Sequence, residues 1–285
     1  MTTIVCTALM LALLAFSDAA MAAALTAARC FASGVMPALL PMMVLGKMMP
    51  DNTKSEHSLT DVWMRAGAFA FAAGSPASAQ RAVEVRPVMK AAHWERLLCL
   101  TGVMSPMFFT GTLASWLGSA KDGWVLLGIH WFGAAITALL WPASGNGTMP
   151  DAACSVKKRI SLPEAISQSA HALLCVCGAM MVFSVAASLV RSAFALLFPL
   201  WTAQHADWLA VLWGVMEIGG GSSAVIGAWQ KPHALVSALC GFGGLSIWLQ
   251  NLLFLEKSIR PARLLCMRAV HGAVCYALVG IFNPF

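Results

Sequence analysis

Paired interruptions of the apolar stretches constrain the fold of this chain most strongly. The segment 73–78, with the sequence Ala-Gly-Ser-Pro-Ala-Ser, has a counterpart in the Gly-Gly-Gly-Ser-Ser of 219–223. A second pair comprises 101–106, which begins Thr-Gly and ends Ser-Pro, and the Gly-Phe-Gly-Gly-Leu-Ser of 241–246. Backbone groups released from a helix are tolerated within a bilayer only where they are buried in protein or line a cavity. The paired breaks therefore predict a solute site near the middle of a membrane.

The composition is that of an integral membrane protein. Hydrophobic residues make up 59% of the 285 residues and charged residues only 11%, against about 25% charged residues in a typical soluble domain. The mean hydropathy is +0.76. The net charge of +6 does not indicate nucleic-acid binding, because the basic residues fall in short loops between apolar spans. The lipid bilayer is the expected partner, and a homo-oligomer is compatible with the sequence.

The apolar spans divide the chain into two halves with the same order of elements. We interpret 1–22 as an N-terminal transmembrane helix or signal anchor, 23–145 as a first repeat, 146–162 as a cytoplasmic linker and 163–285 as a second repeat. Each repeat is expected to hold three crossings and one re-entrant hairpin, and an odd number of crossings inverts the second copy. The sequence thus predicts an all-α integral membrane protein with about seven transmembrane helices plus two re-entrant hairpins in two inverted repeats.

The spans of the two repeats are bounded by polar and helix-breaking residues. In the first repeat they are expected at 24–49, at a hairpin beginning with 66–73, at 97–117 and at 124–141. In the second repeat they are expected at 161–198, at a hairpin over 209–221, at 234–255 and at 264–282. The first span of the second repeat opens with the capping-box spacing of Ser161 and Glu164.

The amino terminus has two interpretations. Residues 19–24 resemble a signal-peptidase region, but no Lys or Arg precedes the apolar stretch 3–16, as a secretory signal requires. This favours a retained membrane helix. With a cytoplasmic amino terminus, 14 of the 18 Lys and Arg residues fall on the inner side or its loops, in agreement with the positive-inside rule.

The chain carries no recognisable catalytic or metal-ligating motif. Eight of the nine cysteines lie in apolar stretches, and no Cys/His spacing fits a metal site. Nucleophile elbow, phosphate-loop and dinucleotide motifs are also missing from the sequence. We therefore expect no enzyme activity and no cofactor other than a coupling proton or sodium ion. His130 and His271 stand at matching positions in the two halves and are expected to bond across helices, with a proton relay as the alternative.

Small residues at the two hairpin tips suggest an anion site. Ser75 precedes Pro76, and Ser222 or Ser223 follows three glycines, so each hydroxyl could N-cap a helix arm. Two such helix N-termini would present free N–H groups to a carboxylate or phosphate. The alternative is that the Gly and Ser residues only allow close helix packing.

Glu217 is the one carboxylate that this interpretation places inside an apolar segment. An intramembrane acid is a functional-site hypothesis, here for carrying a proton or binding sodium. The alternative is a neutral Glu that bonds to freed backbone. Together with polar residues of the broken crossings, the predicted substrate-binding set is Gly74, Ser75, Ser78, Thr101, Ser105, Glu217, Gly220, Gly221, Ser222, Ser223, Ser246 and Gln250.

At these positions the chain resembles the YlbJ-type sporulation integral membrane proteins, which belong to the nucleoside-recognition (Gate) domain group. The residues that carry the resemblance are the Gly-Ser-Pro-Ala-Ser-Ala of 74–79, the Ser-Pro-Met-Phe of 105–108, the Met-Glu-Ile of 216–218, the Phe-Gly-Gly-Leu-Ser of 242–246 with Gln250, and Arg268 with His271. This chain is compact, with a short central linker and little extramembrane sequence.

The resemblance implies an architecture similar to concentrative nucleoside transporters. It also implies transport of dipicolinic acid across the outer forespore membrane during sporulation, and hence a multi-pass location in a bacterial inner or outer forespore membrane. The expected function is a transporter of a small anionic or heteroaromatic metabolite. The alternative is a non-transporting Gate-fold membrane scaffold of spore assembly.

Overall fold

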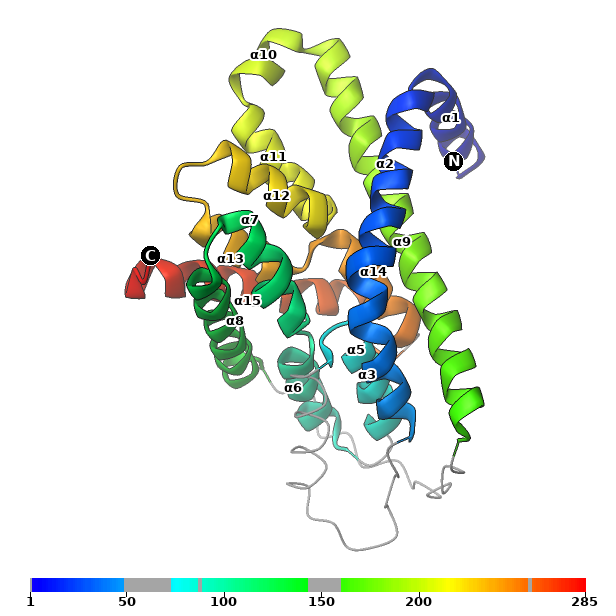
Figure 1. The fold of residues 1–285 in the computed structure, drawn as a ribbon, viewed down its shortest axis with the longest axis vertical. Coiled ribbons are helices and arrows are strands. Elements are labelled where there is room, and N and C mark those ends of the chain that lie inside the picture. The colour runs from blue at the N-terminus through cyan, green and yellow to red at the C-terminus, as the bar shows by residue number, and fades with distance from the viewer. Residues whose placement is uncertain (1, 49–72, 87–88, 143–159, 256–257) are drawn as a thin grey trace, which may run out of the picture.

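The computed structural model describes residues 2–48, 73–86, 89–142, 160–255 and 258–285, and these residues form helices without strands (Figure 1). Within them, four helices are long and apolar enough to cross a membrane: Ala120–Leu140, Leu162–Leu197, His233–Leu255 and Pro261–Phe282. A bent pair over 6–15 and 17–35 meets the same criteria as a fifth span. The protein is therefore an all-α, multi-pass membrane protein, as the sequence predicts at this level.

The first half contains the helices α1 (Thr2–Ala15), α2 (Ser17–Cys30), η1 (Phe31–Val35), α3 (Met36–Met48), α5 (Ala77–Val85), α6 (Ala91–Thr101), η3 (Phe108–Leu113), α7 (Ala114–Leu117) and α8 (Ala120–Leu140). The second half contains α9 (Leu162–Leu197), α10 (Pro199–Gln204), α11 (Ala206–Met216), α12 (Ile218–Ala228), α13 (His233–Phe242), α14 (Gly244–Leu255) and α15 (Pro261–Phe282). Both η elements are π-helical turns inside longer helices.

The peripheral layer is formed by α9, which runs along one edge of the molecule beside α2 and α3 (Figure 1). Its bounds agree with the predicted span 161–198, although the Ser161 side chain makes no cap hydrogen bond. Large apolar side chains such as Leu174 and Leu196 are exposed on it. Such a surface faces lipid in a membrane protein, where apolar contact carries no hydration cost.

The amino-terminal region differs from the expectation of one helix ending near residue 22. The axis bends by 95° between 6–15 and 17–35, at the top of Figure 1. The second helix then continues through residue 22 into η1 and α3. The first arm of the first hairpin (66–73) and the predicted linker (146–162) lie almost entirely outside the described residues.

Matching elements in the two halves have a constant separation. His130 and His271 are 141 residues apart. The same separation joins the helix starts at Ala77 and Ile218. It also joins Gly102 and Gly243, each of which directly follows a helix that ends at a break. Three pairs of described positions thus share one sequence separation.

Two glycines allow the close approach of α13 and α15. A Cβ atom on Gly272 of α15 would lie 2.8 Å from the Ala238 carbonyl oxygen of α13. One on Gly241 would lie 2.8 Å from the Gly272 Cα atom. Because backbone cannot move aside as a flexible side chain can, these positions need glycine.

We predict that Gly272→Ala destabilises the protein by about 1–3 kcal/mol, because the added methyl group overpacks the contact between α13 and α15. Thermal unfolding of the purified protein in detergent measures this effect. Gly280→Ala is the matched control on α15, since nothing lies within 4 Å of its added Cβ. Equal melting temperatures for the two variants would contradict the close approach.

Candidate functional site

A cavity of about 470 Å³ lies among the helix breaks of both halves. This volume is within the range of about 300–1,000 Å³ that is usual for small-molecule sites. Its lining comes from η1, the tip at Ser75 and Pro76, the η3–α7 helix, the break at Glu217 and the start of α14. Residues from the breaks of both halves therefore line one cavity.

The twelve predicted substrate-binding residues fall into three groups according to the cavity that they line in the structure. Those that line the large cavity are Ser75, Ser105, Glu217, Ser246 and Gln250. Ser78 and Thr101 instead line a separate small cavity. The remaining five, which are not among the lining residues of either cavity, are Gly74, Gly220, Gly221, Ser222 and Ser223.

The glycines in the third group act in packing, which was the alternative interpretation of the tips. Gly74 has a φ of +70°, in the left-handed region that favours glycine. A Cβ on Gly220 would lie 2.8 Å from the ring of Trp213, and one on Gly221 would lie 2.8 Å from the backbone carbon of the same residue. Gly221 therefore lets α11 and α12 pack closely as a hairpin.

Ser75 does not cap a helix, contrary to the sequence-based hypothesis. The helix α5 begins at Ala77, and its N-cap residue Pro76 makes no side-chain cap. The Ser75 hydroxyl instead donates to Asn251 Oδ1 at 2.5 Å, and its N–H donates to the Val103 carbonyl oxygen at 2.7 Å. This residue therefore joins the segment before α5 to the segment that follows α6 and to α14.

The second break lies at Glu217, not at the three glycines. The Gly219 N–H donates to Glu217 Oε1 at 2.8 Å, and the Gly220 N–H donates to Oε2 at 2.7 Å. Glu217 is thus the N-cap of α12, and Ser222 lies buried inside that helix. The hypothesis that Ser222 or Ser223 caps this helix is wrong. The N-terminus of α12 already holds a carboxylate of the protein itself, so it is not a free site for an external anion.

The rest of the cavity lining is apolar and aromatic. The Phe108 and Trp116 rings, which both line it, meet edge to face with 6.2 Å between centroids. The flexible thioethers of Met104, Met107 and Met180 add to this surface. Among the described residues that line the cavity there is no Lys, Arg or His. Planar apolar groups are therefore well accommodated, beside one carboxyl group and several uncharged polar groups.

Sequence analysis missed the contribution of the two π-helical turns. Ser33 and Gly34 of η1, and Gly111 and Thr112 of η3, line the cavity. Turns of this kind inside an α-helix occur frequently at functional sites. A signal was present, because each turn carries a glycine beside a small hydroxyl residue within an apolar stretch.

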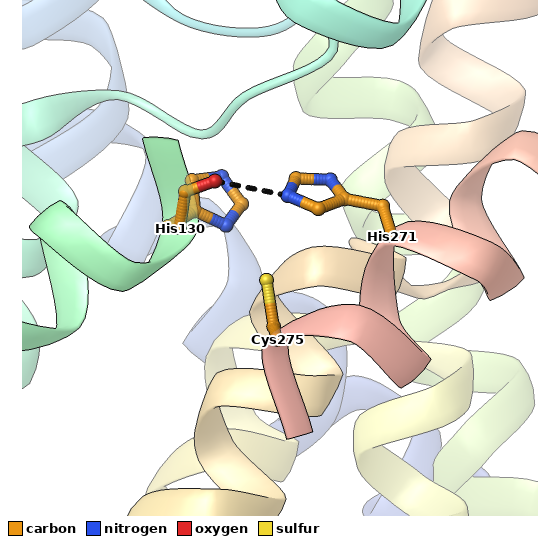
Figure 2. A group of neighbouring side chains, drawn as sticks. All are labelled: His130, His271 and Cys275. Carbon is orange, nitrogen blue, oxygen red and sulfur yellow. Dashed lines mark hydrogen bonds between the residues drawn. The ribbon is translucent and has the colours of Figure 1, made fainter. Parts of the chain in front are cut away.

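Two buried histidines join the central helices (Figure 2). The Met104 N–H donates to His130 Nε2 at 2.9 Å. His271 Nε2 is 3.0 Å from the His130 carbonyl oxygen, which can only accept, so the imidazole donates this bond. Interhelical hydrogen bonding, the expected role of this pair, is therefore observed.

Cys275 lies beside the two rings, and one possible ligand atom from each of the three residues lies within 4.8 Å of the others. Figure 2 shows His271 directing its bonded nitrogen toward His130, with its second nitrogen on the far side of the ring. A metal ion at this point would have to replace the hydrogen bond between α15 and α8. We therefore interpret the cluster as a structural contact between these helices.

Comparison of this chain with known protein families, with curated proteins and with solved structures finds no match. The function is therefore inferred from the residues and geometry of the site.

We predict that Glu217→Ala destabilises the protein by about 1–3 kcal/mol, because two N–H groups of α12 lose their acceptors inside the protein. Glu217→Gln should lie between Ala and the wild type, because an amide nitrogen cannot accept and only one cap survives. Thermal unfolding in detergent measures both variants. Glu164→Ala, at an exposed acid in the first turn of α9, is the control. A Gln variant as stable as the wild type would contradict the double cap.

Proposed function

We propose that the protein is a membrane transporter of a small heteroaromatic or anionic metabolite that binds in the central cavity. The observation that supports this most directly is the convergence of helix breaks from both halves on one cavity that contains Glu217. Released backbone beside a cavity at membrane depth is typical of secondary transporters. A pocket of this size also has no evident use in a protein that only holds partners together.

The arrangement proposed for transport is two inverted repeats with about seven crossings and two re-entrant hairpins. The constant separation of 141 residues between matching positions supports an internal repeat. In this proposal one hairpin ends at the tip next to Ser75 and the other at Glu217. Alternating access would then open the cavity to one side of the membrane at a time by moving one hairpin.

The substrate is proposed to contain a planar ring. Phe108 and Trp116 provide aromatic surface, and the Gln250 side chain offers both a donor and an acceptor beside it. Dipicolinate, which the sequence resemblance suggests, has such a ring and is the first compound to test. Its carboxylates would meet Glu217 as a like charge, so binding would require a proton or a sodium ion at this site. The proposed location is the bacterial inner or outer forespore membrane.

Cys30 lines the cavity and allows a direct test of where the substrate binds. We predict that a bulky methanethiosulfonate reagent on Cys30 lowers dipicolinate uptake into proteoliposomes at least about tenfold, because steric overlap in the cavity exceeds 1.4 kcal/mol. Substrate present during labelling should slow the modification. The control is Cys30→Ser, which should transport normally and resist the reagent.

Normal uptake after complete modification of Cys30 would contradict this cavity as the substrate site. A folded protein that transports neither dipicolinate nor uridine would contradict the transport proposal for these ring compounds. It would favour the alternative of a scaffold.

A coupling role of Glu217 can be separated from substrate binding by a conservative substitution. Glu217→Gln removes the titratable charge, so the variant should exchange substrate down its own gradient but lose accumulation driven by a proton or sodium gradient. Paired measurements of exchange and accumulation in the same proteoliposomes test this. Gradient-driven accumulation by the variant at the wild-type level, with unchanged pH and sodium dependence, would rule out a coupling role for Glu217.

A further inference from the structure

A second and much smaller cavity, of about 10 Å³, lies beside the break that follows α6. A space of this size holds one particle of about the size of a water molecule. Its polar lining residues are Ser78, Thr101, Asn251 and Arg268, which come from α5, α6, α14 and α15. Both halves of the chain therefore contribute to it.

Arg268 brings a buried positive charge to this cavity. Its side chain is only 2% exposed. The guanidinium Nη atoms donate to carbonyl oxygens at the end of α6, those of Gly102, Leu98 and Cys99. Within the described part of the chain, no carboxylate forms an ion pair with it, and its Nε–H has no hydrogen-bond partner. A buried charge without a counterion is strongly unfavourable.

The other polar groups around the cavity can all donate hydrogen bonds. Asn251 Oδ1 already accepts from the Ser75 hydroxyl, so the amide group of Asn251 has its N–H donors left. The Ser78 hydroxyl is fully buried and has no partner. Ser78 also lies in the first turn of α5, where the helix dipole favours negative charge. The Thr101 hydroxyl completes this set of donors.

We propose that the small cavity binds a monatomic anion, with chloride as the physiological ligand. A water molecule at this point would leave the guanidinium without a counterion. Sulfate, phosphate and carboxylates are too large for a cavity of about 10 Å³. The anion would satisfy the Nε–H of Arg268 and the hydroxyl of Ser78 together.

The bound anion would stabilise the break on which the large cavity depends. Arg268 holds the carbonyl oxygen of Gly102, and the next residue, Val103, accepts the N–H of Ser75. An anion beside the guanidinium would lower the cost of burying its charge, and would therefore stabilise the packed state in which Arg268 bonds to the end of α6. This inference concerns the folded protein and stands whether or not the large cavity transports a solute.

The test is thermal unfolding of the full-length protein in detergent at constant ionic strength, with sodium chloride replacing sodium gluconate. We expect a saturable rise in melting temperature with chloride. Bromide should substitute for chloride, and sulfate should not. Crystals grown in bromide should show an anomalous-scattering peak between Arg268 and Ser78. A melting temperature that is the same in chloride and gluconate would overturn the proposal and would indicate a water-filled cavity.

Substitutions of the cavity residues test whether the effect of chloride on the melting temperature arises at this site. Ser78→Ala and Thr101→Val each remove one donor with little change of volume, and each should weaken the apparent chloride affinity about tenfold or more. Ser169→Ala is the matched control, because Ser169 is also fully buried without a partner but lies in α9, away from the cavity. If both cavity variants keep the chloride dependence of the wild type, the site is overturned. This test does not require a variant of Arg268, whose loss could prevent folding.

Discussion

Backbone groups released at the helix breaks must find partners inside the protein, and this requirement determines how the centre of the molecule is arranged. The Ser75 N–H is satisfied by the Val103 carbonyl oxygen, and the Met104 N–H by a ring nitrogen of His130. At the second break, the two oxygens of Glu217 satisfy two N–H groups of α12. The polar residues His130 and Glu217 are therefore explained first by the backbone groups that they satisfy.

Several of these bonds cross from one half of the chain to the other. Asn251 of α14 accepts from Ser75 at the first hairpin tip, and Arg268 of α15 holds the end of α6. The breaks of the first half therefore depend on side chains of the second half. For a proposed transporter this has a direct consequence, because any movement of the first hairpin has to exchange or carry these bonds.

The sequence was sufficient to predict that helix breaks occur in both halves, and to predict the bounds of α9. It was not sufficient to predict which residue caps each break, because Glu and Ser are both good N-caps and both were available near the three glycines. The carboxylate forms the cap because glycines at 219 and 220 leave the backbone N–H groups open to a side chain from the preceding residue. The π-helical turns were missed because the glycine and hydroxyl residues within them are equally typical of close packing between membrane helices.

Glu217 combines a structural and a chemical role in a way that bears on the proposed mechanism. Both oxygens accept hydrogen bonds from α12, and the same residue lines the large cavity. A proton placed on one oxygen turns that oxygen into a donor, so it competes with an N–H group for the same position. Protonation would therefore loosen the start of α12 while removing the negative charge from the cavity. In the proposed transporter, the proton that removes the repulsion between Glu217 and an anionic substrate also weakens the hydrogen bonds at the start of α12. Binding of the substrate would thereby be coupled to movement of the second hairpin.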